Sequence, residues 1–213
     1  MTLSNMDTKE SGIYIRSQET GLPGLQALLS KGFSVQARVG GSLSRLLCGQ
    51  LGIDADYLKN RVQTLFLNSS PVDDVEKTVV SDGDIVALSA AMPGLVGATM
   101  RKGGFYAKLR QRISCQATGT GSGDSPAEST LGTVTIRLFN VVARELGPAF
   151  LEKGVDVDVS AVRVFLNLAA PVLTGSESSL MLDGKKVTLA ALLEAGRPGQ
   201  AIRLSIQATG DGR

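Results

Sequence analysis

Several short stretches of this chain alternate apolar and polar residues, which predicts β-strands that bury one face. The clearest are Phe33–Val39, Thr133–Phe139 and Val155–Val159. After the first of them, Ser42 stands where a helix N-cap belongs, ahead of the sequence LSRLLCGQLGI, whose leucines fall on one helical stripe. Strands mixed with a few helices predict an α+β fold.

Other segments of the first half complete a small mixed sheet with a helix across one face. The predicted elements are a strand over Gly12–Arg16, a turn and short helix over Leu22–Leu29, a strand over Val62–Leu67 and a last strand over Ile85–Leu88. The last strand follows a tight turn at Asp82-Gly83-Asp84.

The second half gives a similar list. The pattern predicts a helix over Asn140–Lys153 that Gly147-Pro148 interrupts, a strand over Val162–Leu166, a hairpin around Asp183-Gly184, a short helix over Ala190–Ala195 and a closing strand over Ala201–Ile206.

The segment CQATGTGSGDSPAEST, Cys115–Thr130, has the composition of a flexible linker. This linker over 115–130 separates a predicted first domain over 11–114, which has a basic C-terminal extension, from a predicted second α+β domain over 131–213. Residues 1–10 are predicted to form a disordered N-terminus. Leu65–Val72 matches Val164–Val172 with one inserted residue, which suggests that the second domain is a diverged duplicate of the first.

Composition argues against most enzyme classes. The chain has no histidine, and its two cysteines, Cys48 and Cys115, are far apart in the sequence. Without histidine the commonest general base and zinc ligand are missing, and the acidic residues follow no ligand spacing, so we expect no catalytic residues, no metal and no cofactor. The net charge of +2 argues against general nucleic-acid binding. No signal sequence and no long apolar run is visible, which predicts a cytoplasmic protein without a membrane span.

Three stretches together resemble a known family. VGGSLSRLLCGQLGI, VQTLFLNSSPV and SDGDIVALSAAMPG are similar to ubiquitin-like β-grasp proteins of the sulfur-carrier type, namely the small subunit of molybdopterin synthase and the thiamine-pathway sulfur carrier. The resemblance covers about residues 33–94 and implies two ubiquitin-like β-grasp domains joined by the linker. It also implies a carrier role for Gly103-Gly104. Family members activate a free C-terminal glycine carboxylate, whereas here residues 105–213 follow, so the chemistry would require cleavage after Gly104.

The segment Arg101–Arg112 is the main candidate binding surface. Its cationic and aromatic residues are Arg101, Lys102, Phe105, Tyr106, Lys108, Arg110 and Arg112, and the apolar stretch before it carries Met92 and Met100. These residues either engage a partner or anchor the segment to its own domain while the cations stay in water. Both interpretations remain open at this point.

The leading functional hypothesis is a non-catalytic binding or adaptor protein that engages a protein partner through its sheet or the Met92–Arg112 segment. The alternative is a sulfur-carrier-like protein of molybdopterin or thiamine biosynthesis, cleaved after Gly104. A third hypothesis is weak binding of RNA or another anionic ligand by the basic segment. Homo-oligomerisation and the identity of the partner stay open.

Overall fold

A computed structural model describes residues 12–18, 21–90, 92, 94–105, 130–175 and 178–208. Its strands form mixed sheets accompanied by helices, in agreement with the predicted α+β class. The predicted disordered terminus over 1–10 and nearly all of the predicted linker over 115–130 lie outside these described residues. Within the described ranges, no helix combines the length and the apolar character that crossing a membrane requires.

The chain divides into two compact units whose composition does not follow the order of the sequence. One unit, here called the central unit, comprises Leu29–Gly147, and the other, the terminal unit, comprises Met1–Leu28 together with Pro148–Arg213. The predicted division into residues 11–114 and 131–213 therefore differs from the division that the contacts follow.

The central unit contains most of the first half of the chain and one strand from the second half. Its elements are β2 (Phe33–Arg38), η1 (Arg45–Gln50), α2 (Ala55–Asn60), β3 (Thr64–Leu67), β4 (Ser70–Pro71), β5 (Ile85–Ser89), α3 (Gly94–Met100) and β6 (Leu131–Leu138). Two helices cross the boundaries between the units, α1 (Leu25–Lys31) and α4 (Asn140–Lys153).

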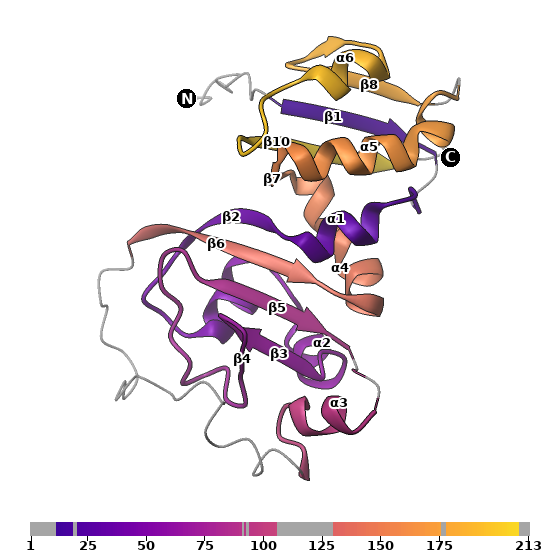
Figure 1. Cartoon of the computed structure of the whole chain (residues 1–213). Helices are drawn as coiled ribbons and strands as arrows, with labels where there is room; N and C mark the ends of the chain where they lie inside the picture. Colours follow the sequence, from indigo (N-terminus) through magenta and orange to yellow (C-terminus); the bar gives the residue numbers. More distant parts are fainter. Residues whose placement is uncertain are drawn as a thin grey trace, which may run out of the picture. The chain divides into compact units, whose positions relative to one another are not determined.

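Strand β6 lies in the interior of the central sheet, whose order is β4-β3-β5-β6-β2. It pairs antiparallel with β2, with Phe33 opposite Ile136, and parallel with β5, with Ala87 opposite Arg137 (Figure 1). A strand from beyond the predicted linker thus satisfies backbone groups on both neighbours, which explains why the unit boundary does not fall at the linker.

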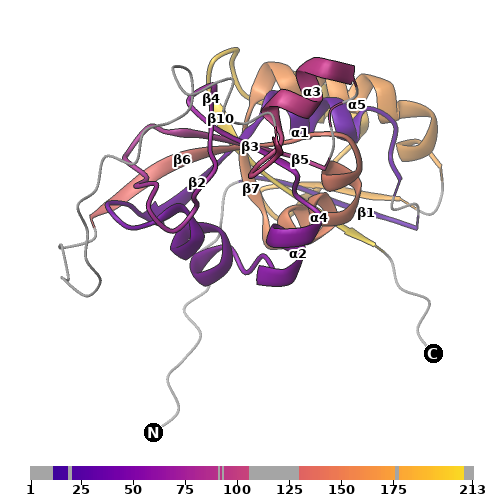
Figure 2. The same ribbon diagram turned by 90° about the horizontal axis from the view of Figure 1, so that it is seen from below.

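The two faces of this sheet differ in character. On one face Val134, Ile136 and Leu138 of β6 are completely buried, and leucines of η1 and α2 are also part of the buried core. Full burial of an aliphatic side chain contributes about 1.5–3 kcal/mol, so these residues bind β6 firmly to the unit. The other face carries alternate residues of β3, β5 and β6, and Figure 2 shows α2 and α3 on opposite sides of these strands.

The terminal unit forms a second mixed sheet. Its elements are β1 (Gly12–Ser17), β7 (Val155–Asp158), α5 (Val159–Leu173), β8 (Ser179–Leu182), β9 (Lys185–Lys186), α6 (Leu189–Glu194) and β10 (Ala201–Ala208). The strand order is β7-β10-β1-β8-β9, with β1 parallel to β10 and antiparallel to β8. The close approach of β1 to β10 requires a glycine at position 12, because a Cβ there would lie 2.8 Å from Cβ of Arg203 on β10.

The predicted strand over Val162–Leu166 is wrong, because these residues lie inside α5 (Figure 1). The Asp158 side chain caps this helix by accepting a hydrogen bond from the Ser160 amide at 2.8 Å. The buried side chains of α5 recur at helical spacing: Val159, Val162, Phe165, Leu166, Ala169 and Leu173.

Because the second block of the predicted internal repeat lies in this helix, the two blocks differ in secondary structure. Leu65–Val72 runs from β3 into β4 through Asn68 and Ser69, which have φ values of 49° and 69°. The matching block Val164–Val172 is entirely helical, and its Leu168-Ala169-Ala170 are good helix formers. The two blocks are therefore similar in amino-acid sequence but not in structure.

One further expectation needs correction, because helix α4 runs through Gly147-Pro148 without the predicted interruption. The apolar stretch after β5, for which the sequence pattern predicted no helix, contains α3.

Cutting the chain between its two halves tests whether β6 and β1 pair with strands from the other half of the chain. With a protease site inserted within residues 115–125, we expect the two cleaved fragments to stay together, because β6 remains bonded to β2 and β5 and β1 to β10. Size-exclusion chromatography with mass spectrometry should give one particle of unchanged size, as for the uncut protein. Fragments that separate without denaturant would contradict the pairing.

Candidate functional site

The central unit carries a cavity of about 490 Å³, here called the open-face cavity, on the sheet face opposite its buried core. Its lining comes from β3, β5, β6 and the residues that directly follow them: Phe66, Ser69, Ile85, Ala87, Ser89, Met92, Arg137, Phe139 and Asn140. The volume and the mainly apolar lining are typical of a small-molecule site.

The floor of the cavity follows from the strand register. Phe66 lies opposite Ala87, and Ala87 lies opposite Arg137, so the three side chains form one row across β3, β5 and β6. The small Ala87 between two long side chains leaves the space.

Among the described residues that line the cavity, Arg137 alone carries a charge. Its Nε atom is buried and has no hydrogen-bond partner within the described part of the chain. Gly32 leaves room beside it, because a Cβ at Gly32 would lie 3.1 Å from Cγ of Arg137. An uncompensated guanidinium beside apolar walls can bind an anionic group.

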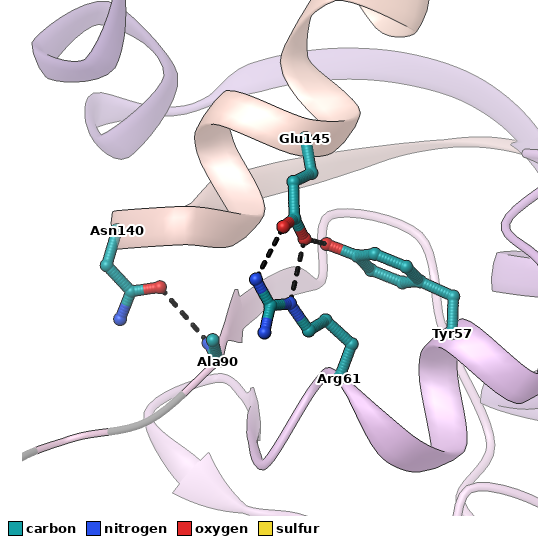
Figure 3. Close-up of polar contacts among 5 residues, drawn as sticks. All are labelled: Tyr57, Arg61, Ala90, Asn140 and Glu145. Carbon is teal, nitrogen blue, oxygen red and sulfur yellow. Dashed lines mark hydrogen bonds and ion pairs between the residues drawn. The ribbon is translucent and has the colours of Figure 1, made fainter.

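Asn140 closes one end of the cavity. Its Oδ1 accepts a hydrogen bond from the Ala90 amide at 3.1 Å (Figure 3), and its Nδ2 donates to the Ser89 hydroxyl at 2.7 Å. Its φ of 48° lies in the left-handed region, which asparagine tolerates better than most residues. These bonds attach the end of β5 to the start of α4.

A second polar cluster joins α2 to the same half of α4 (Figure 3). The Tyr57 hydroxyl donates to Oε2 of Glu145 at 2.7 Å, and the Arg61 guanidinium donates to both carboxylate oxygens at 3.0 and 2.6 Å. The hydrogen bonds from Arg61 and Tyr57 lower the pKa of Glu145 to about 2. The pKa of Tyr57 is raised, first by burial and then by its bond to Glu145. Because both carboxylate oxygens are engaged, this cluster serves to hold the elements together.

A separate cleft of about 570 Å³ lies around Cys48 and Lys102. Nζ of Lys102 donates to the Leu58 carbonyl at 2.8 Å, and the Gly103 amide donates to Oδ1 of Asp73 at 3.2 Å. Burial, followed by the charge of Glu76, raises the pKa of the Cys48 thiol, and burial lowers the pKa of Lys102. A thiol with a raised pKa is not an activated nucleophile.

The predicted binding residues occupy different environments. Arg101 is exposed and Phe105 is 89% exposed, whereas Lys102 is half-buried in the Cys48 cleft. Gly103-Gly104 forms a turn in which the Gly104 amide donates to the Arg101 carbonyl. Met92 lines the open-face cavity, and Met100 is partly exposed at the end of α3. The remaining predicted binding residues lie outside the described ranges: Tyr106, Lys108, Arg110 and Arg112.

Helix α3 presents apolar side chains to solvent. Leu95 and Val96 are 74% and 64% exposed. A Cβ at Gly97 would lie 1.9 Å from the Met92 carbonyl oxygen, so the glycine lets α3 pack against the chain that precedes it.

Sequence reasoning did not single out Arg137, Phe66 or Asn140. The alternation over Thr133–Phe139 places Arg137 on the polar face of its strand, but nothing local indicates that Phe66 and Ala87 lie beside it. Among the described residues, no group of three or more potential metal ligands is present.

The Glu145 cluster predicts a pH dependence of stability. The folded pKa of about 2 lies below the ordinary value of 4.5, so the stabilisation is present above pH 4.5 and is lost as the pH falls toward 2. The difference in unfolding free energy between wild type and Glu145→Gln should therefore shrink over this range. Chemical denaturation at several pH values measures it, with Glu76→Gln as the control, and a difference independent of pH would contradict the assignment.

Asn140 predicts a distinct order of two variants. Asn140→Ala and Asn140→Gly both lose the bonds to Ala90 and Ser89, but only alanine is strained at positive φ. We expect the alanine variant to be less stable than the glycine variant by about 1–2 kcal/mol in urea denaturation. Equal stability would show that the backbone does not hold this conformation.

The chain matches no protein-family model, and it shows no significant similarity to any curated protein or solved structure.

Proposed function

We propose that the protein is a non-catalytic binding or adaptor protein. Its central unit is a module of the β-grasp type, and the segment Met92–Phe105 engages a protein partner. The observation that carries the proposal is the apolar, solvent-facing side of α3.

The strand pattern of the central unit supports the β-grasp assignment. The three stretches that resemble the sulfur carriers contain η1, β3, β4 and β5, and all of these elements belong to this one unit. The closing strand β5 runs parallel to the interior strand, which in turn pairs antiparallel with the strand before the helix. In this chain β6 takes the interior position, where a contiguous β-grasp domain would place the strand preceding β2.

The exposed residues support a protein partner. Leu95, Val96 and Phe105 all expose more than half of their surface, and they lie close together in the chain. Clustered exposed apolar side chains mark interaction surfaces more often than isolated ones do. A partner surface that covers them would therefore be largely apolar.

The chemistry of the described side chains supports a non-catalytic role. The Cys48 thiol has a raised pKa, and Glu145 is committed to Arg61 and Tyr57. Neither group is prepared for nucleophilic or acid–base catalysis.

Two alternatives receive less support. A product cleaved after Gly104 would leave β6 on the other fragment, so a released sulfur carrier would lack its interior strand. Binding of RNA by the basic segment loses one of its cations, because Lys102 is half-buried and donates to the Leu58 carbonyl.

A matched pair of charge substitutions tests the proposal. We expect Leu95→Lys/Val96→Lys to abolish capture of a partner from native-host extract, because a partner surface would have to bury two cations. Leu131→Lys changes a leucine that is also 74% exposed, at the far end of β6, and should leave capture intact. Affinity purification with quantitative mass spectrometry compares the two variants with wild type.

Two results would overturn the proposal. One is a set of captured proteins that is unchanged by the double substitution. The other is native protein whose intact mass ends at Gly104, which would favour the sulfur-carrier alternative.

A further inference from the structure

We propose that the open-face cavity of the central unit binds a small apolar group that carries a carboxylate, with Arg137 as the residue that pairs with the carboxylate. This ligand site is separate from the outer face of α3. The side chains that define it do not include Leu95, Val96 or Phe105.

The apolar part of the ligand follows from the walls. Phe66, Ile85 and Phe139 surround the short side chain of Ala87, and Met92 adds a flexible apolar side chain at the edge. Water in such a space gains little from its surroundings, whereas an alkyl or aromatic group would bury apolar surface on several sides.

The anionic part follows from the polar groups that remain uncommitted. Asn140 and Ser89 bond to each other, and Asn140 also accepts from the Ala90 amide. Arg137 has no such partner among the described residues, and its Nε is buried, so the walls supply a positive charge without an acidic residue to neutralise it. Supplying an anion from the ligand removes the cost of burying this group unpaired.

A carboxylate fits better than a phosphate for a reason of charge. The described lining supplies one guanidinium, that of Arg137, and its planar fork matches the two oxygens of a monoanionic carboxylate. A phosphate dianion would enter an apolar site with half of its charge uncompensated.

Two sources can supply this chemistry, a free carboxylic acid or the C-terminal carboxylate of a peptide that ends in an apolar residue. Octanoate and octanamide test the first source, and a short peptide ending in leucine, with a free or an amidated C-terminus, tests the second. Isothermal titration with the full-length protein measures the affinity of each probe. We expect at least one carboxylate probe to bind, and its neutral counterpart to bind at least about tenfold more weakly.

Three variants locate the site. Arg137→Gln should weaken binding of the carboxylate probe at least about tenfold and abolish its preference over the amide. Ala87→Leu should abolish binding by filling the floor, whereas Arg45→Gln, an exposed arginine on η1, should change nothing. Circular dichroism and the urea midpoint establish that each variant is folded.

The outcomes are distinct from those of the partner test. Binding of octanoate alone, or of the free peptide alone, supports the site and identifies its source. The proposal is overturned if neither carboxylate binds, if acid and amide bind equally, or if a folded Arg137→Gln or Ala87→Leu variant retains wild-type affinity. Loss of partner capture in Leu95→Lys/Val96→Lys bears on α3 alone.

Discussion

The pairing of β6 with both β2 and β5 is the interaction on which the central unit depends. One face of β6 supplies Val134, Ile136 and Leu138 to the core, and the other supplies Arg137 to the cavity. The same strand therefore builds the hydrophobic core and the candidate ligand site. Any substitution that shifts its register by one residue would exchange the two faces and place a guanidinium in the core.

The contacts that follow β6 extend this dependence to the start of α4. Asn140 binds the end of β5, and Glu145 binds Tyr57 and Arg61 on and just after α2. All of these partners precede residue 105, whereas Asn140 and Glu145 come after residue 130. The cavity accordingly has walls from both halves of the chain, and it exists only where those halves have joined.

Most elements could be predicted from the sequence, but their partners could not. Alternation located β2, β6 and β7, and the turn at Asp82-Gly83-Asp84 located β5, because these signals are local. Val162–Leu166 is predicted as a strand because Val162 and Val164 are β-branched, whereas the helical spacing that begins at the Asp158 cap extends beyond this short window. Which strand lies beside β5 is not a local property, since β1 and β6 both offer alternating apolar residues. Phe66, Ala87 and Arg137 form one row only because β6 lies beside β5. For this reason the site could not be predicted from the sequence.

The pairing of strands from the two ends of the chain also determines when each unit can complete its sheet during translation. β1 is among the first described elements to leave the ribosome, yet its neighbours β8 and β10 are among the last, with Gly12 paired to Arg203. The strands β2, β3 and β5 likewise emerge with an unfilled gap until residues 131–138 follow. Neither unit can close as it is translated, so the growing chain carries unpaired strand edges for most of its synthesis. The nascent polypeptide, more than the finished protein, is thus the form that needs protection from aggregation.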